Sequence, residues 1–284
     1  MVKKILAKGY VYLVLLFLYA PIAVLVIYSF TPSATMQWQG FSFALYQDLF
    51  NPSKSVAILD ALKNTIIIAT VSSVISTLIG VFASIGIYNM KRRSKEAMMT
   101  ISKIPMMNAE IVTGVSLMLL FLLFGISFGM VTVIIAHIVF CTPYVILSIM
   151  PKLQQMDNNL YEAALDLGCT PMKALVKAVI PQILSGVVSG FFLAFTLSID
   201  DFVVTIFNIQ GINTLSTFIY ADAAKNGLTP SLRALSTMIL VSVLLLLIIV
   251  NILSHREKKS NSKAVTKIKA SDKNKSKKVK GAKV

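Results

Sequence analysis

The sequence is poor in charged side chains, because Asp, Glu, Lys and Arg make up only 14% of its 284 residues. Soluble domains carry about 25%. Hydrophobic residues make up 56% of the chain, and the mean hydropathy is +0.78. This balance excludes an ordinary soluble domain and indicates that lipid surrounds most of the chain.

Cysteine is also scarce, with two residues in the whole chain. Cys141 lies in an apolar run and Cys169 in a polar stretch, so the pair predicts neither a disulfide framework nor a metal site. A phosphate-binding loop with its lysine, an HExxH motif, a CxxC pair and a serine nucleophile elbow are all absent. We therefore expect no cofactor, metal or catalytic residue. Uphill transport would have to take its energy from another subunit or from a gradient.

Long apolar runs are the main feature that is present. A transmembrane helix needs about 20 apolar residues, and six runs qualify: residues 10–30, 64–89, 104–124, 130–150, 182–207 and 234–253. The first is too long for a signal peptide and contains Pro21, so we expect it to be retained. The sequence predicts an all-α membrane protein with six transmembrane helices, the last five forming a core over residues 64–253. Residues 31–63 and 208–233 are expected to be polar loops on the extracellular side.

Positive charge is concentrated on the other side of the predicted topology. Residues 1–9, 91–103, 151–181 and 254–284 together hold 23 of the 27 Lys and Arg residues. This asymmetry places both termini in the cytoplasm, and it persists without the last segment. Residues 254–284 form a basic tail that we expect to be disordered and solvated. Attraction to anionic lipid is a second interpretation and RNA binding a third. No nucleic-acid partner is expected.

The segment from Asp157 to Pro181 is the one long amphiphilic stretch among the spans. Asp157–Asn158 can cap a first helix over residues 158–167, and Gly168 suits the left-handed position after it. The Thr170–Pro171 pair is typical of a helix start, and Pro181 is expected to end or kink this second helix. The pattern predicts a helical hairpin within a cytoplasmic loop, residues 151–181.

The first helix of this hairpin carries Glu162-Ala163-Ala164. Two adjacent alanines leave a shallow surface that another protein can approach closely, and Glu162 adds one charge. The hairpin is therefore suited to docking into a groove of a soluble partner. An ordinary amphipathic loop is the alternative.

Acidic side chains within the spans are candidates for function, because burying them in lipid is costly. Glu110 lies in the third run, and Asp200 and Asp201 lie in the fifth. Adjacent helix positions point about 100° apart, so both aspartates can face a pore only if the helix is broken there. Such acids suit a cationic or polyamine substrate, whereas interhelical hydrogen bonds are the alternative. Asp222 is a weaker candidate, and His137 is expected to be a hydrogen-bonded packing residue.

The hairpin carries a recognisable signature. Glu162-Ala163-Ala164 is followed after three residues by Gly168, and Ile180-Pro181 closes the pattern. The chain resembles the permease subunits of binding-protein-dependent ABC importers, in which this loop is the coupling helix that docks on the ATP-binding subunit. The isoleucine of the family pattern falls on Ala178, which is a departure in the second helix.

Within that family the chain is similar to the spermidine/putrescine permeases over most of its length. The segments that carry the similarity include residues 61–65, 110–112, 197–204 and 234–237. The resemblance implies a type-1 ABC importer permease of MetI-like architecture, multi-pass in a bacterial cell membrane and not itself an enzyme. It implies two copies of an ATP-binding subunit, a second related permease and an extracellular polyamine-binding protein, with membrane lipid around them.

The resemblance also implies roles for individual residues. Glu162, Ala163, Ala164 and Gly168 would couple the chain to the ATPase. Asp200, Asp201, Glu110 and Asp222 would line the path of the polycation, which would cross by alternating access.

Three alternatives remain open. The cargo of such an importer could differ, because the coupling signature does not specify it. A gradient-driven carrier that works alone would leave the hairpin without a role. A membrane anchor with a basic tail for lipid or RNA is the third.

Overall fold

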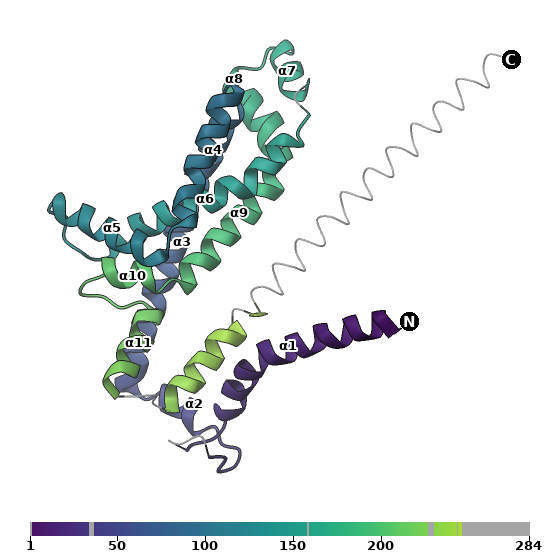
Figure 1. Cartoon of the computed structure of the whole chain (residues 1–284). Helices are drawn as coiled ribbons and strands as arrows, with labels where there is room; N and C mark the ends of the chain where they lie inside the picture. Colours follow the sequence, from purple (N-terminus) through teal and green to yellow (C-terminus); the bar gives the residue numbers. More distant parts are fainter. Residues whose placement is uncertain (1, 34–36, 158, 227–229, 243, 246–284) are drawn as a thin grey trace. The chain divides into compact units, whose positions relative to one another are not determined.

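The computed structural model describes residues 2–33, 37–157, 159–226, 230–242 and 244–245 (Figure 1). The chain divides into two units, residues 52–228 and residues 1–51 with 229–284. The regular structure of the described residues is helical throughout. This confirms the all-α fold class.

The smaller unit contains α1 (Val2–Tyr28) and the short α2 (Ala44–Leu49). Residues 230–242 are also helical. Two polar contacts join this helix to the segment after α1: Ser231 donates to the Asp48 carboxylate at 2.6 Å, and the Arg233 guanidinium donates to the Ser33 carbonyl at 2.6 Å. Within the first predicted span, residues 10–30, the structure has one helix as far as Tyr28, with Pro21 inside it.

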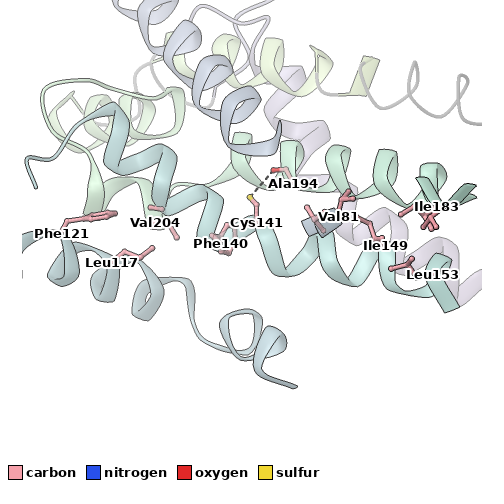
Figure 2. Close-up of a cluster of buried hydrophobic side chains, with 13 residues drawn as sticks. Val81, Leu117, Phe121, Phe140, Cys141, Ile149, Leu153, Ile183, Ala194 and Val204 are labelled. Carbon is pink, nitrogen blue, oxygen red and sulfur yellow. Dashed lines mark hydrogen bonds between the residues drawn. The ribbon is translucent and has the colours of Figure 1, made fainter. Parts of the chain in front are cut away.

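The larger unit is built on three long helices that pack side by side: α3 (Pro52–Tyr88), α6 (Met130–Gln154) and α9 (Ile180–Asp200) (Figure 1). Their contact surfaces are apolar or carry small side chains, which lets helices approach closely in lipid. Figure 2 shows the core between them, with Cys141 of α6 facing Ala194 of α9.

Helices α6 and α9 contact each other at intervals of four residues, in antiparallel order. Contacts join Ile149 to Gly186, Val145 to Gly190, Cys141 to Ala194 and His137 to Ser198. A side chain at Gly186 would have its Cβ 3.3 Å from the Ile149 Cα, and one at Gly190 would be 3.4 Å from the Val145 Cα. Glycine is required at both positions because the two backbones nearly touch. The first two of these contacts are apolar, the third is a weak hydrogen bond from the Cys141 thiol to the Ala194 carbonyl at 3.5 Å, and the last is polar.

The third predicted span is not one straight helix. Residues 92–107 form α4 (Arg92–Met107) and residues 110–123 form α5 (Glu110–Leu123), and the two are bent by 99° at Asn108–Ala109. The expected basic loop 91–103 is therefore mostly helical, since its residues lack helix breakers. Pro105 lies inside α4, and the bend follows it three residues later.

The hairpin contains α7 (Asn159–Asp166) and α8 (Pro171–Ala174). Of the two expectations for Pro181, an end or a kink, the end is wrong, because α8 passes through a π-helical turn, η1 (Leu175–Val179), directly into α9. The Ile180 N–H bonds to the Leu175 carbonyl, five residues back. Pro181, which has no N–H to donate, follows directly after this wider turn.

The fifth span and the following loop also differ from expectation. Helix α9 ends at Asp200, and a separate α10 (Val203–Asn208) follows. The expected polar loop 208–233 contains α11 (Leu215–Asn226). This helix starts where Thr214 and Thr217 cap each other: the Thr214 N–H donates to Thr217 Oγ1 at 2.9 Å, and the Thr217 N–H donates to Thr214 Oγ1 at 3.5 Å.

Within the part of the chain that the structure describes, four helices are long and apolar enough to cross a membrane. The number rises to five if α4 and α5 count as one bent span. The sixth predicted span, residues 234–253, lies partly outside the described residues. The basic tail 254–284 lies wholly outside them.

Candidate functional site

The docking hairpin is closed by a hydrogen-bond pattern that explains the spacing of its signature. The Cys169 N–H donates to the Ala164 carbonyl at 3.0 Å, and the Gly168 N–H donates to the Leu165 carbonyl at 2.8 Å. These two bonds define a Schellman motif, which requires a left-handed residue four positions after the first carbonyl. Gly168 has φ +82° and occupies that position. The three residues between Ala164 and Gly168 are therefore the length that this helix end needs.

The start of α7 behaves as expected. The Asp157 carboxylate accepts from the Asn159 N–H at 3.0 Å, while Asn158 lies outside the described residues. Glu162 and Ala163 are exposed and Ala164 is half-buried.

The outer surface of the hairpin exposes apolar side chains. Leu167 is 86% exposed and Met172 is 66% exposed. Beneath α7 lies a pocket of about 520 Å³ between the ends of α3 and α6 and the η1 turn, lined in part by Tyr88, Tyr161 and Glu162. The hairpin therefore offers a folded surface, partly apolar, at the end of the bundle where α3 ends and the basic residues 91–95 begin.

The two adjacent aspartates have different environments. Asp200 is the last residue of α9 and is exposed, and its carboxylate has no hydrogen bond or ion pair among the described residues. Asp201 is extended, with φ −65° and ψ 129°, and its side chain is 2% exposed. The helix is thus broken at this pair.

The Asp201 carboxylate caps the start of α10. It accepts from the Val204 N–H at 3.3 Å, and from both the N–H and the hydroxyl of Thr205 at 2.8 Å. Such bonds satisfy N–H groups that the break would leave unpaired. The Ser216 hydroxyl donates to the Asp201 carbonyl at 2.9 Å, so the start of α11 is fixed to the same break.

His137 lies beside this cap, buried with 1% of its side chain exposed. Its Nε2 is 2.9 Å from Thr205 Oγ1 and 3.4 Å from Asp201 Oδ2, and its Nδ1 is 2.6 Å from Ser198 Oγ. Ser198 Oγ is in turn 3.1 Å from Ser72 Oγ of α3. We call these five residues the polar chain. It confirms that His137 is a hydrogen-bonded packing residue.

Glu110 is the first residue of α5, directly after the 99° bend, and it is exposed. Its carboxylate has no hydrogen bond or ion pair among the described residues. Helices α5 and α10 pack together: the Asn208 amide donates to the Gly114 carbonyl at 3.2 Å. The break at Asp201 and the bend before Glu110 therefore belong to adjoining helices. Asp222 lies in α11, half-buried and with a partner.

Comparison with known proteins identifies the family. Residues 76–259 match the binding-protein-dependent transport system inner membrane components. The chain belongs to this family. It is a permease subunit of an ABC importer and not an enzyme, it crosses the cell membrane several times, and its family implies an ATPase subunit and a binding protein as partners.

Individual relatives are more specific. The chain is 35% identical over 254 residues to the spermidine/putrescine transport system permease protein PotC of Haemophilus influenzae, covering 88% of this chain and 97% of the relative. It is 34% identical over 236 residues to the putrescine transport system permease protein PotI of Escherichia coli K12, covering 80% and 83%.

Solved structures agree on the fold. A bacterial ABC transporter involved in the import of the acidic polysaccharide alginate matches with a TM-score of 0.69 and 13% identity, covering 88% of this chain and 95% of that one. The MetNI methionine ABC transporter in an inward-facing conformation matches with a TM-score of 0.58 and 18% identity, covering 73% and 97%. At this level of identity the match supports the fold and not the cargo.

Reasoning from the sequence missed the roles of Ser72, Ser198 and Thr205. Each is a hydroxyl residue in an apolar run, and such residues usually bond to their own helix. A signal did exist, because Ser198 lies three residues before Asp201 and Thr205 lies four residues after it. The sequence does not show that His137, about 60 residues earlier, lies between them.

Proposed function

We propose that this chain is a permease subunit of an ATP-driven importer for polyamines, forming half of the translocation path. The observation that carries the proposal is the pair of exposed carboxylates, Asp200 and Glu110, at two helix interruptions in adjoining spans. Neither is neutralised within the described chain. A relative that is 35% identical over most of both chains is a spermidine/putrescine permease.

The physical reason is charge complementarity in a poorly solvated path. Opposite unit charges 4 Å apart attract by about 1 kcal/mol in water and about 4 kcal/mol where the effective dielectric constant is near 20. Flexible polycations with several amines can meet several separated carboxylates in turn. Asp222, on α11, would add a third acid toward the outer side. Asp201 is adjacent to Asp200, but its carboxylate already accepts hydrogen bonds from the N–H groups at the start of α10.

The hairpin is the proposed coupling element. Glu162, Ala163 and Ala164 would present the docking surface on the ATPase, and Gly168 would fix the end of α7. The hairpin and basic residues 91–95 lie at one end of the bundle, and the positive-inside rule assigns such an end to the cytoplasm. In this orientation both termini would lie in the cytoplasm, with the expected loop 31–63 outside.

The complete importer would contain two ATP-binding subunits, a second related permease and an extracellular polyamine-binding protein. ATP binding would close the ATPase pair and move the docked hairpins. The spans would then expose the path first to one side and then to the other.

Uptake of labelled spermidine and putrescine tests the proposal. The full complex in proteoliposomes should import them with ATP inside, and Asp200→Asn should reduce uptake by about tenfold or more, a change worth about 1.4 kcal/mol. Asp200→Glu keeps the charge and is the matched control.

The outcomes separate the alternatives. Unchanged uptake in Asp200→Asn would refute the charge argument. ATP-dependent import of an uncharged or anionic solute in place of polyamines would leave an ABC importer with another cargo. Flux through the purified chain alone, without ATP, would favour a gradient-driven carrier.

A further inference from the structure

The polar chain contains more hydrogen-bond contacts than its hydroxyl protons can supply, and counting these protons assigns the state of His137. The Thr205 hydroxyl has one proton, which it donates to Asp201 Oδ2 at 2.8 Å. Thr205 Oγ1 can therefore only accept from His137 Nε2, 2.9 Å away. Nε2 must carry a proton.

The other ring nitrogen, Nδ1, lies 2.6 Å from Ser198 Oγ. The Ser72 hydroxyl donates to the Ile68 carbonyl at 2.6 Å, which leaves the Ser72 oxygen to accept from Ser198 across 3.1 Å. With the Ser198 proton used in this way, the Ser198 oxygen accepts from Nδ1. In this arrangement both ring nitrogens donate, and the resulting imidazolium would face Asp201 Oδ2 at 3.4 Å.

We propose that His137 is a positioning residue for transport: its buried ion pair with Asp201 holds Asp201 as the cap of α10 and thereby leaves Asp200 alone facing the path. This inference rests on the proposed function for its transport consequence. It assigns the adjacent aspartates different tasks, one capping a helix and the other contacting the polycation.

The geometry explains why the pair is needed. Asp201 alone would place a charge among buried neighbours, since Val204, Thr205 and Ser198 are at most 3% exposed. Burying a carboxylate is costly unless an opposite charge and hydrogen bonds compensate it. Without this cap, α9 would be free to continue through residue 201. Asp200 would then no longer lie at an exposed helix end beside the break.

A double-variant cycle tests the pairing. His137→Gln and Asp201→Asn each leave one buried charge uncompensated, so each should lower spermidine uptake by about tenfold, after correction for the amount of assembled complex. The double variant has no uncompensated charge, and its two amides can still hydrogen-bond. We expect it to recover most of the uptake. The matched control combines His137→Gln with Asp200→Asn and should show no recovery.

Kinetics distinguish positioning from general stability. Loss of folded protein lowers the maximal rate in proportion to the assembled complex, whereas a misdirected Asp200 raises the KM for spermidine. We therefore expect a raised KM in His137→Gln that returns toward the wild-type value in the double variant. Wild-type uptake and KM in His137→Gln, or a double variant no better than the worse single one, would overturn the proposal.

A measurement without polyamine separates this proposal from the proposed function. Cys141 and Cys169 are replaced by serine, Asp200→Cys is introduced, and a cationic membrane-impermeant methanethiosulfonate reports the exposure of residue 200 in the assembled complex. Labelling should slow by about threefold or more in His137→Gln and recover with Asp201→Asn. Ser94→Cys, at an exposed position of α4 outside the hairpin and the proposed path, is the control and should label at one rate throughout.

Failure of the proposed function and failure of the positioning role therefore give different results. Labelling that changes as expected, in a complex that imports no polyamine, refutes the proposed function and supports the positioning role. Labelling that ignores His137 refutes the positioning role, whatever the cargo.

Discussion

The left-handed end of α7 offers a quantitative test of the coupling hairpin. Gly168 has φ +82°, and a Cβ added there would meet nothing within 4 Å. Gly168→Ala should therefore add no clash, only backbone strain, of about 1–2 kcal/mol. If the hairpin must be folded to dock, this strain lowers the affinity for the ATPase subunit by about 5- to 30-fold.

The assay is titration of the purified permease complex in detergent with its ATPase subunit. Gly168→Asn should bind more tightly than Gly168→Ala, because asparagine tolerates the left-handed region better than alanine. Gly86→Ala is the matched control: Gly86 lies inside α3, where an added Cβ meets nothing. That substitution should leave docking unchanged and stabilise the helix by about 0.5–1 kcal/mol.

Two results would refute the reasoning. If Gly168→Ala bound the ATPase within twofold of wild type, the fold of the hairpin end would not limit docking. If Gly86→Ala weakened docking equally, the loss would reflect general damage.

Three further predictions concern packing and capping. Gly190→Val should lower the stability of the protein by about 1–3 kcal/mol, because its Cβ would lie 3.1 Å from Val145 Cγ1. Size-exclusion profiles after heating measure this loss, and an unchanged profile would contradict the prediction. Leu167→Glu should leave folding intact, since Leu167 is 86% exposed, yet weaken ATPase binding in the same titration; unchanged binding would remove Leu167 from the interface. Thr214→Val removes the cap of α11 at a cost of about 1 kcal/mol. It should therefore speed amide hydrogen exchange over residues 215–220. Exchange at the wild-type rate would show that the cap is dispensable.

Local signals in the sequence were sufficient for the hairpin. The left-handed Gly168, the Asp157 cap and the helix start at Pro171 all appear in the structure as expected. Each depends on backbone geometry within a few residues. The π turn before Pro181 was not predicted, because it changes the hydrogen-bond register and the sequence shows no sign of that change.

The interruptions of the spans were less predictable. The runs at 104–124 and 182–207 are predominantly apolar, so hydropathy shows two single spans. The break at Asp201 depends instead on contacts with distant segments. Asp201 is stabilised in its extended conformation by His137, 64 positions earlier in the chain. Periodicity and composition contain no information about such a pairing.

The helix interruptions and the acidic residues beside them are linked by one physical requirement. Backbone groups in a membrane-spanning segment must be hydrogen-bonded, and irregular backbone persists only where protein or a water-filled cavity satisfies it. At the α9–α10 break the Asp201 carboxylate accepts hydrogen bonds from the start of α10, with His137 Nε2 3.4 Å away. The carboxylate of Asp200, at the end of α9, has no such partner among the described residues. Under the proposed function, the path of a polycation needs an acid that has no structural partner. The two adjacent aspartates would then divide the tasks, with Asp201 capping α10 and Asp200 contacting the substrate.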